Sequence, residues 1–188
     1  MPLYMDRHEL HGVTAADVAG AHAADLAVAG AYGVEFLTYW FDPDRGTAFC
    51  LARAGQGADV QAVHAASHGL VPNEVIEVGE ADVLRFLGRV RDPAGDAVGA
   101  AFRVVVFTDL EGSTGLLTRL GEAAYLGLLG EHDRLVRQAL ADHRGREVKH
   151  TGDGFMAAFD GVAPALRCAL AIQAAFATRP AAGPGLDM

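Results

Sequence analysis

The chain has 188 residues, of which 51% are hydrophobic and 21% charged, so it can bury the core of one large domain or two small ones. Its formal net charge of −9 argues against a general nucleic-acid-binding protein, which would carry a basic face. The first ten residues are too polar for a signal peptide, and no apolar run approaches the ~20 residues of a membrane span. We therefore expect a cytoplasmic protein without a membrane segment.

The first part of the chain predicts strands and helices in the order β-α-β-β-α-β. Thr14 precedes an alanine-rich stretch typical of a capped helix, and the sequence DPDRG predicts the turn of a hairpin. The expected elements are a strand over 2–6, a helix to residue 30, strands over 34–41 and 47–52, a helix over 58–67 and a strand over 73–78. This order is that of the ferredoxin-like fold, which we assign to residues 1–80.

The remaining chain predicts a second α+β domain. Residues 81–101 are expected to form a short helix and a linker, because Pro, Gly and small residues dominate their second half. The run FRVVVFTDL that follows is typical of a strand buried on both faces. Beyond it we expect helices over 115–120 and 122–142, a hairpin around Gly152-Asp153-Gly154, and a helix over 164–177. Residues 102–188 form the second predicted domain.

Acidic residues and histidines concentrate in the first segment. Residues 1–80 hold 11 of the 24 carboxylates, 3 of the 15 Lys and Arg residues, and five of the eight histidines. Such a segment either attracts divalent cations or is an ordinary acidic surface. Cys50 and Cys168 belong to no paired-cysteine motif, so we expect two buried thiols in a reducing compartment.

Residues 102–177 resemble the N-terminal half of the class III adenylate and guanylate cyclase catalytic domain. The resemblance lies in VVVFTDLEGST and VKHTGDGFMAAF. It implies a ferredoxin-like core in which Asp109 and Asp153 hold two Mg²⁺ or Mn²⁺ ions. Two hard cations neutralise the charge of a nucleoside triphosphate and activate the attacking hydroxyl, which suits conversion of ATP to cyclic AMP and pyrophosphate.

The same resemblance implies a nucleotide site built from the turn after the strand. Leu110, Gly112, Ser113 and Thr114 lie there, and backbone N–H groups at a helix N-terminus suit phosphate oxygens. Lys149 occupies the position that selects adenine in adenylate cyclases. The alternative is a solvated hairpin lysine.

The cyclase resemblance is partial. The family takes a further purine contact, an Asn and an Arg from a later segment, and this sequence ends at Met188 without that pattern. Whether the chain is an enzyme, formally a phosphorus–oxygen lyase, is therefore open, and we expect little or no cyclic nucleotide from it as it stands.

Residues 2–78 are similar to small bacterial ferredoxin-like proteins of poorly defined function. The stretches PLYMDRHEL, AHAADLA, TAFCLARA and HAASHGLVPNEVIEV carry the similarity. Some members bind nickel at their surface as dimers, which implies Ni²⁺ or Zn²⁺ here.

The residues of this segment permit a metal site. Helical spacing places His22 with Asp25, and His64 with His68, while His8 and Asp6 alternate on one strand. Imidazole and carboxylate suit Ni²⁺, Zn²⁺ or Cu²⁺ better than Mg²⁺. The predicted ligands are His8, His22, Asp25, His64 and His68. The alternative is histidines at the edge of the core or on the surface, without any metal.

The leading interpretation is an adenylate-cyclase-type domain behind a small metal-binding or sensor module, working as a homodimer on ATP. The first alternative is a non-catalytic, nickel-binding or nucleotide-binding regulatory protein. The second is a metal buffer whose later half is a non-functional remnant.

Overall fold

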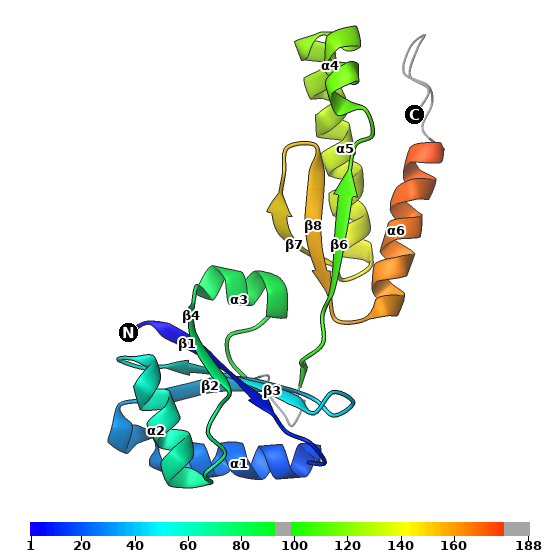
Figure 1. The fold of residues 1–188 in the computed structure, drawn as a ribbon. Helices are drawn as coiled ribbons and strands as arrows, with labels where there is room; N and C mark the ends of the chain where they lie inside the picture. Colours follow the sequence, from blue (N-terminus) through cyan, green and yellow to red (C-terminus); the bar gives the residue numbers. More distant parts are fainter. Residues whose placement is uncertain (93–98, 179–188) are drawn as a thin grey trace. The chain divides into compact units, whose positions relative to one another are not determined.

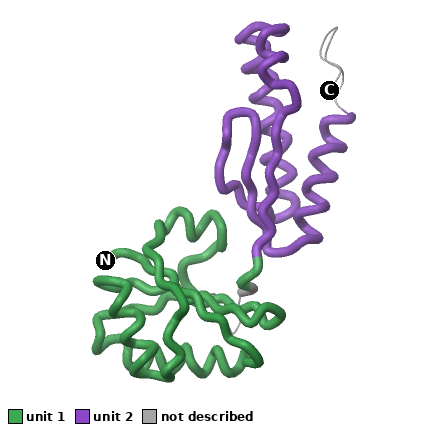
Figure 2. The backbone as a smooth tube through the Cα atoms, in the orientation of Figure 1, with its two compact units in different colours: residues 1–102 green, residues 103–188 purple. Residues whose placement is uncertain are grey.

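The computed structural model describes residues 1–92 and 99–178, and its fold class is α+β as predicted. The chain divides into two compact units, residues 1–102 and 103–188 (Figure 2). Each unit has its own β-sheet and its own core. In the described part of the chain, no helix has the length and apolar character needed to cross a membrane.

Unit 1 follows the expected βαββαβ order (Figure 1). Its elements are β1 (Leu3–Glu9), α1 (Ala15–Val28), a 3-10 turn η1 (Ala29–Tyr32), β2 (Glu35–Asp42), β3 (Thr47–Arg53), α2 (Gly57–Ser67), β4 (Glu74–Val78), α3 (Glu80–Leu87) and β5 (Gly99–Ala100). The strand order is β4-β1-β3-β2-β5, and all pairs are antiparallel except β2 with β5.

Local sequence explains where these elements begin and turn. Thr14 caps α1 in a capping box, because its side chain accepts from the Asp17 N–H while the Asp17 carboxylate accepts from the Thr14 N–H. Gly46 closes the β2–β3 hairpin with a φ of 59°, where a Cβ would lie 2.3 Å from the carbonyl oxygen of Leu10. Only glycine fits that turn.

The two faces of the unit 1 sheet are covered differently. Helices α1 and α2 pack on one face, over a core that includes Phe36, Ala52 and Val63. Helix α3 covers the other face, where Val83 packs with Trp40 and the neighbouring apolar residues (Figure 1). The segment expected to be a short helix and a linker thus holds a helix packed into unit 1 and a strand paired with β2. Residues 93–98 of the expected linker lie outside the described residues.

Unit 2 repeats the pattern without a fourth described strand. It contains β6 (Val104–Asp109), α4 (Ser113–Leu120), α5 (Glu122–Asp142), β7 (Arg146–His150), β8 (Gly154–Phe159) and α6 (Val162–Ala177). The strand order is β6-β8-β7, so β6 forms an edge of the described sheet.

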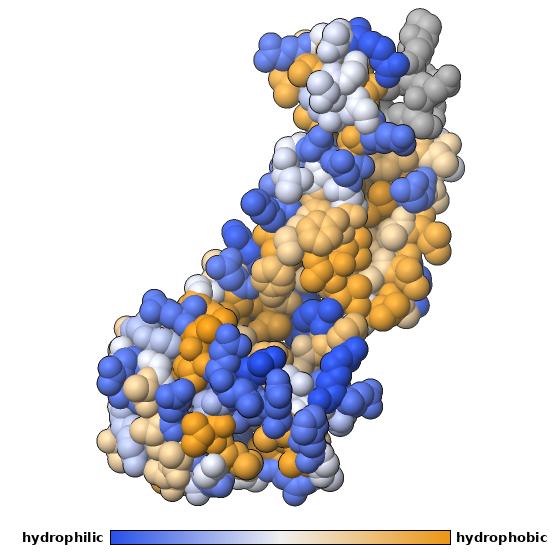
Figure 3. Space-filling view, viewed as in Figure 1, coloured by the Kyte–Doolittle hydropathy of each residue, from blue (hydrophilic) through white to orange (hydrophobic). Residues whose placement is uncertain are grey.

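One prediction for unit 2 is wrong: β6 is not buried on both faces. Its residues alternate between half-buried and exposed, and the side chain of Phe107 is 71% exposed. The reason is its place at the sheet edge, where only one face packs against α6 and the core. Leu166 and Leu170 of α6 are also exposed, and Figure 3 shows apolar side chains gathered over these two elements.

Candidate metal centre

A buried polar cluster lies between the unit 1 sheet and the helices α1 and α2. β1 contributes Asp6 and His8, two residues apart and therefore on one face of the strand. β3 contributes Cys50, which stands directly opposite Asp6 in the antiparallel register. α1 contributes Asp25, and α2 contributes His64. All five side chains are buried beneath the helices.

His64 is the centre of this cluster. Its Nε2 lies 3.0 Å from Asp6 Oδ2, and its Nδ1 lies 3.1 Å from Asp25 Oδ2. Burial alone would lower the pKa of His64, but the hydrogen bonds and charges of Asp25 and Asp6 outweigh it and raise the pKa from 6.5 to about 9. In the metal-free protein His64 is therefore an imidazolium that donates one N–H to each carboxylate.

Each carboxylate has further partners. Asp6 Oδ1 accepts from the Cys50 backbone N–H at 3.0 Å and lies 3.3 Å from His8 Nε2. Burial would raise the pKa of Asp6, but its hydrogen bonds with His64 and His8 lower it overall. Asp25 accepts from the Ser67 hydroxyl and lies 3.1 Å from His68 Nε2.

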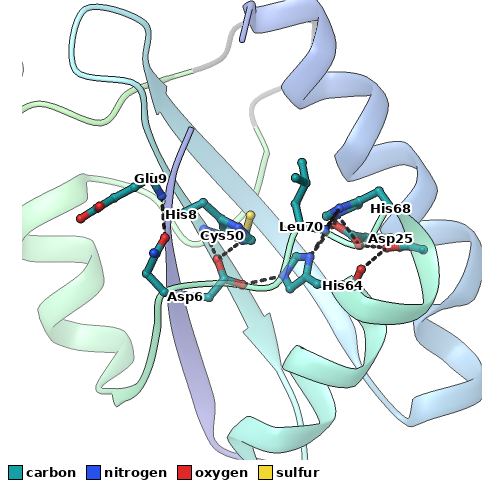
Figure 4. A network of polar contacts seen from close by, with 10 residues as sticks. Asp6, His8, Glu9, Asp25, Cys50, His64, His68 and Leu70 are labelled. Carbon is teal, nitrogen blue, oxygen red and sulfur yellow. Dashed lines mark hydrogen bonds and ion pairs between the residues drawn. The ribbon is translucent and has the colours of Figure 1, made fainter. Parts of the chain in front are cut away.

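The tautomer of His68 follows from its other neighbour. The Leu70 backbone N–H donates to His68 Nδ1 at 3.1 Å, so this nitrogen is an acceptor and Nε2–H is the donor to Asp25. The groups form a continuous chain from His8 and Asp6 through His64 to Asp25 and His68 (Figure 4).

Among the described residues, two sets of donor atoms in this cluster lie close enough to bind one ion. The first set is Asp6, His8, Cys50 and His64, all buried, with ligand atoms within 4.8 Å of one another. The second is Asp25, His64 and His68. The first set offers one carboxylate oxygen, two imidazole nitrogens and one sulfur, a combination that suits Zn²⁺, Ni²⁺, Co²⁺ or Cu²⁺ and not Mg²⁺.

Cys50 is not among the ligands that the sequence predicts, because it is expected there only as a buried thiol. Both cysteines are indeed free and buried. Burial raises the pKa of the Cys50 thiol well above its usual value, and the charges of Asp6 and Asp25 add to that effect. The thiol is therefore protonated in the metal-free protein, and an ion must displace its proton to bind sulfur.

His22, predicted as a ligand, belongs to neither donor set among the described residues. Its ring packs against Tyr39 with centroids 4.6 Å apart and against Phe36 at 6.0 Å. The helical spacing placed His22 near Asp25 correctly, but its ring turns toward the aromatic side chains of β2. His8, Asp25, His64 and His68 are brought together as expected.

The charge state of His64 leads us to predict how the stability of the metal-free protein depends on pH. A folded pKa above the unfolded value gives stability that is complete below about pH 6.5 and is lost as pH rises through about 9. We expect the free energy of unfolding of unit 1 to fall by roughly 3 kcal/mol across that window. Fluorescence of Trp40, the single tryptophan and fully buried in unit 1, measures this in urea titrations.

The variant His64→Gln provides the comparison for this prediction. It cannot titrate, so most of the decline between about pH 6.5 and pH 9 should disappear. An equally steep decline in the variant would mean that another group causes it.

The predicted nucleotide site in unit 2 is assembled only in part. Asp109 pairs with Gly154 across the β6–β8 ladder, which places it one residue from Asp153. Gly112 caps α4 with a φ of 66°, and Ser113 and Thr114 begin that helix. Leu110 is buried in a small apolar core with Leu116 and Leu128.

A cavity of about 800 Å³ lies beside Asp109, Leu110 and Gly112. Arg119 of α4 lines it, as do Phe107 and residues of α6, whereas Asp153 and Lys149 are not among its described lining residues. Asp109 thus ends β6 opposite Gly154, and Asp153 lies in the turn directly before β8. The predicted nucleotide ligands do not all line one cavity among the described residues.

Part of unit 1 matches a known protein family. Residues 4–78 match the family model described as nickel responsive protein SCO4226-like. The crystal structure of SCO4226 from Streptomyces coelicolor A3(2) is 39% identical, covering 40% of this chain and 94% of that chain, with a TM-score of 0.39. The matched segment lies within unit 1. No curated protein matches the chain.

A second solved structure covers more of the chain at a lower identity. It is a bacterial light-regulated adenylyl cyclase, 11% identical, which covers 94% of this chain and 66% of that chain with a TM-score of 0.38.

Proposed function

We propose that unit 1, whose residues 4–78 belong to the SCO4226-like nickel-responsive family, binds one divalent transition-metal ion through Asp6, His8, Cys50 and His64. One observation carries the proposal: four buried side chains of three ligand types present donor atoms within 4.8 Å of one another. Burying this many ionisable groups is costly unless they are paired or hold a cation. The chemical role is to sense or sequester the ion.

Asp25 and His68 have a supporting role in this site. When His64 binds through Nε2, its Nδ1–H remains hydrogen-bonded to Asp25 at 3.1 Å, and this carboxylate–histidine arrangement fixes the ring and raises its basicity. Ser67 and His68 in turn hold Asp25. An ion bound at the second donor set would instead be coordinated by His64 Nδ1, and Cys50 would not be a ligand.

Calorimetric titration of the full chain tests the proposal. Ni²⁺ and Zn²⁺ should each bind saturably with one ion per chain, and the binding should release protons from Cys50 and His64. Mg²⁺ should give no binding in unit 1 because the donor set contains nitrogen and sulfur. If neither Ni²⁺ nor Zn²⁺ binds saturably, the proposal is wrong.

A second candidate function, suggested by the register of β6 and β8, is binding of a metal–nucleotide complex in unit 2. Asp109 and Asp153 occupy neighbouring positions at the end of the ladder, and the 800 Å³ cavity beside Asp109 is large enough for a nucleotide. Two carboxylates at this spot suit Mg²⁺ or Mn²⁺ with the phosphates of ATP. This candidate function is binding only, and an assay for cyclic AMP formed from ATP tests separately for turnover.

The proposed roles of Asp109 and Asp153 lead to a prediction about Mn²⁺ binding. Asp109→Ala and Asp153→Ala should each weaken ATP-dependent Mn²⁺ binding by at least about tenfold, because one carboxylate alone cannot hold a two-ion cluster. The measurement is Mn²⁺ titration by electron paramagnetic resonance with and without ATP. Asp142→Ala, at the exposed end of α5, is the matched control and should change nothing. If all three variants show the same ATP-dependent Mn²⁺ affinity, Asp109 and Asp153 do not form the proposed metal–nucleotide site.

A further inference from the structure

The second donor set of unit 1 lies nearer to solvent than the first. We call it the outer set, and its members are Asp25, His64 and His68. The first set, called the buried set, consists of Asp6, His8, Cys50 and His64. The side chain of His68 is 15% exposed, whereas no member of the buried set exceeds 6% exposure. An ion that arrives from solvent therefore meets His68 before it meets a ligand of the buried set.

His64 joins the two sets through the opposite nitrogens of one ring. Its Nε2 lies 3.0 Å from Asp6 Oδ2 in the buried set, and its Nδ1 lies 3.1 Å from Asp25 Oδ2 in the outer set. The same Nδ1 lies 3.3 Å from His68 Nε2. Figure 4 shows the His64 ring between the two groups of ligands. One ring can thus present a donor atom to an ion on either side.

A small recess borders both sets. Its volume is about 40 Å³, which is room for an ion with one or two water molecules. All three members of the outer set line it, and so do His8, Cys50 and His64 of the buried set. Asp17 adds a carboxylate, and no Lys or Arg is among the described lining residues, so the recess favours a cation. An ion can therefore move between the sets through this space without disturbing the close-packed core.

We infer that the outer set is where the ion enters unit 1, and that His64 passes the ion from the outer set to the buried set. The inference rests on the metal site proposed above. It makes Asp25 and His68 transient ligands during entry, in addition to their supporting contacts in the loaded site. The same route in reverse releases the ion.

The two nitrogens of His64 exchange roles as the ion moves. On entry, His64 releases its Nδ1 proton to solvent and binds the ion through Nδ1, together with Asp25 and His68. On transfer, His64 exchanges the Nδ1–metal bond for an Nε2–metal bond, releases the Nε2 proton and takes up a proton on Nδ1. The Cys50 thiol loses its proton to solvent as its sulfur binds. The nitrogen that is not bound to the ion thus donates to a carboxylate throughout, to Asp6 before transfer and to Asp25 after it.

The tautomer of His68 makes the outer set the weaker of the two. The Leu70 N–H donates to His68 Nδ1 at 3.1 Å, so the proton of the neutral ring lies on Nε2, the nitrogen that faces Asp25 and His64. To bind an ion through Nε2, His68 must move this proton to Nδ1 and give up the Leu70 hydrogen bond. That loss weakens binding by roughly two- to tenfold, and the outer set has no sulfur. A ligand set from which the ion leaves readily suits entry and not storage.

The experiment uses the full chain and Co²⁺, whose visible absorption reports its coordination. Calorimetry first establishes Co²⁺ binding, which tests the proposed function by itself. Stopped-flow absorption then measures the association rate, and the dissociation rate after excess chelator is added. His68→Ala should slow both rates by at least about tenfold, so that the affinity changes by much less than either rate. His11→Ala, which removes an exposed histidine of unit 1, is the control and should change neither.

The opposite pattern of rates would overturn the entry route. If His68 only held Asp25 and His64 in place, His68→Ala would speed dissociation and leave association unchanged. That result, or two unchanged rates, would mean that the ion reaches the buried set without the outer set.

A second variant tests the path without touching a ligand. Ala21 lines the recess, whereas Ala23 is exposed on the same helix. Ala21→Leu should slow association and dissociation alike, by at least about tenfold, and leave the affinity within about twofold. Ala23→Leu should leave both rates unchanged. Trp40 fluorescence in urea confirms that Ala21→Leu is folded, and unchanged rates in the folded variant would show that the ion does not pass through the recess.

The outer set can also be observed alone. A chain with both His8→Ala and Cys50→Ala lacks two ligands of the buried set and should still bind one Co²⁺, at least about 100-fold more weakly. Adding His68→Ala should abolish this residual binding, and residual binding that persists would overturn the outer set as a binding position. Failure of Co²⁺ to bind the unmodified chain overturns both proposals. Tight binding with rates that His68→Ala and Ala21→Leu leave unchanged overturns the entry route alone.

Discussion

Replacing Cys50 by alanine is expected to weaken binding of Ni²⁺ or Zn²⁺ to the full chain by at least about 100-fold. Cys50 supplies the only sulfur of the donor set, and loss of a direct ligand should cost more than the 10–100-fold typical of an outer partner. His64→Ala should have an equal or larger effect, because His64 belongs to both donor sets.

Matched controls make this result specific. The chain has one other cysteine, Cys168, which is also buried and free, so Cys168→Ala should leave the affinity unchanged. His11 is an exposed histidine of unit 1, and His11→Ala should also leave the affinity unchanged. Calorimetry measures the affinities, and near-ultraviolet absorption of the Ni²⁺ protein reports the thiolate. If Cys50→Ala binds as tightly as Cys168→Ala, the ion does not use the buried set.

Replacing Asp6 by alanine is expected to destabilise the metal-free unit 1 by about 3–5 kcal/mol. Asp6 is 1% exposed and accepts from His64 Nε2 and the Cys50 backbone N–H, both at 3.0 Å. Removing it leaves a buried donor without a partner and an imidazolium with one carboxylate instead of two, and the loss of one partner from a buried ion pair costs this much. Asp6→Asn keeps one acceptor and should cost less.

Urea unfolding followed by Trp40 fluorescence measures this change in unit 1. Glu77→Ala, an exposed carboxylate on β4, is the control and should change stability by less than about 0.5 kcal/mol. A loss below about 1 kcal/mol in Asp6→Ala would mean that the Asp6–His64 pair contributes little to the native state.

Much of unit 1 could be predicted from the sequence because its signals are local. The Thr14 cap, the DPDRG turn and the alternation of Asp6 and His8 depend on neighbouring residues, and the structure confirms them. The pairing of His64 with His68 also follows from helical spacing and is confirmed, with ring nitrogens 3.3 Å apart. The predicted order of elements, β-α-β-β-α-β, is also the observed order.

The features that the sequence did not predict depend on contacts between distant segments. Cys50 lies in an apolar strand, and only the β1–β3 register, which sets it opposite Asp6, brings it into the polar cluster. The orientation of His22 toward Tyr39 required knowledge of β2. For β6, an apolar run gives no information on its place in the sheet, so the exposure of Phe107 could not be foreseen.

X-ray absorption at the zinc edge of the Zn²⁺-loaded chain tests the central claim most directly. The buried set predicts one sulfur at about 2.3 Å and nitrogen or oxygen ligands at about 2.0–2.2 Å, two of them imidazole. The sulfur signal should vanish in Cys50→Ala and persist in Cys168→Ala. A shell of nitrogen and oxygen alone in the unmodified protein would contradict the account and place the ion away from Cys50.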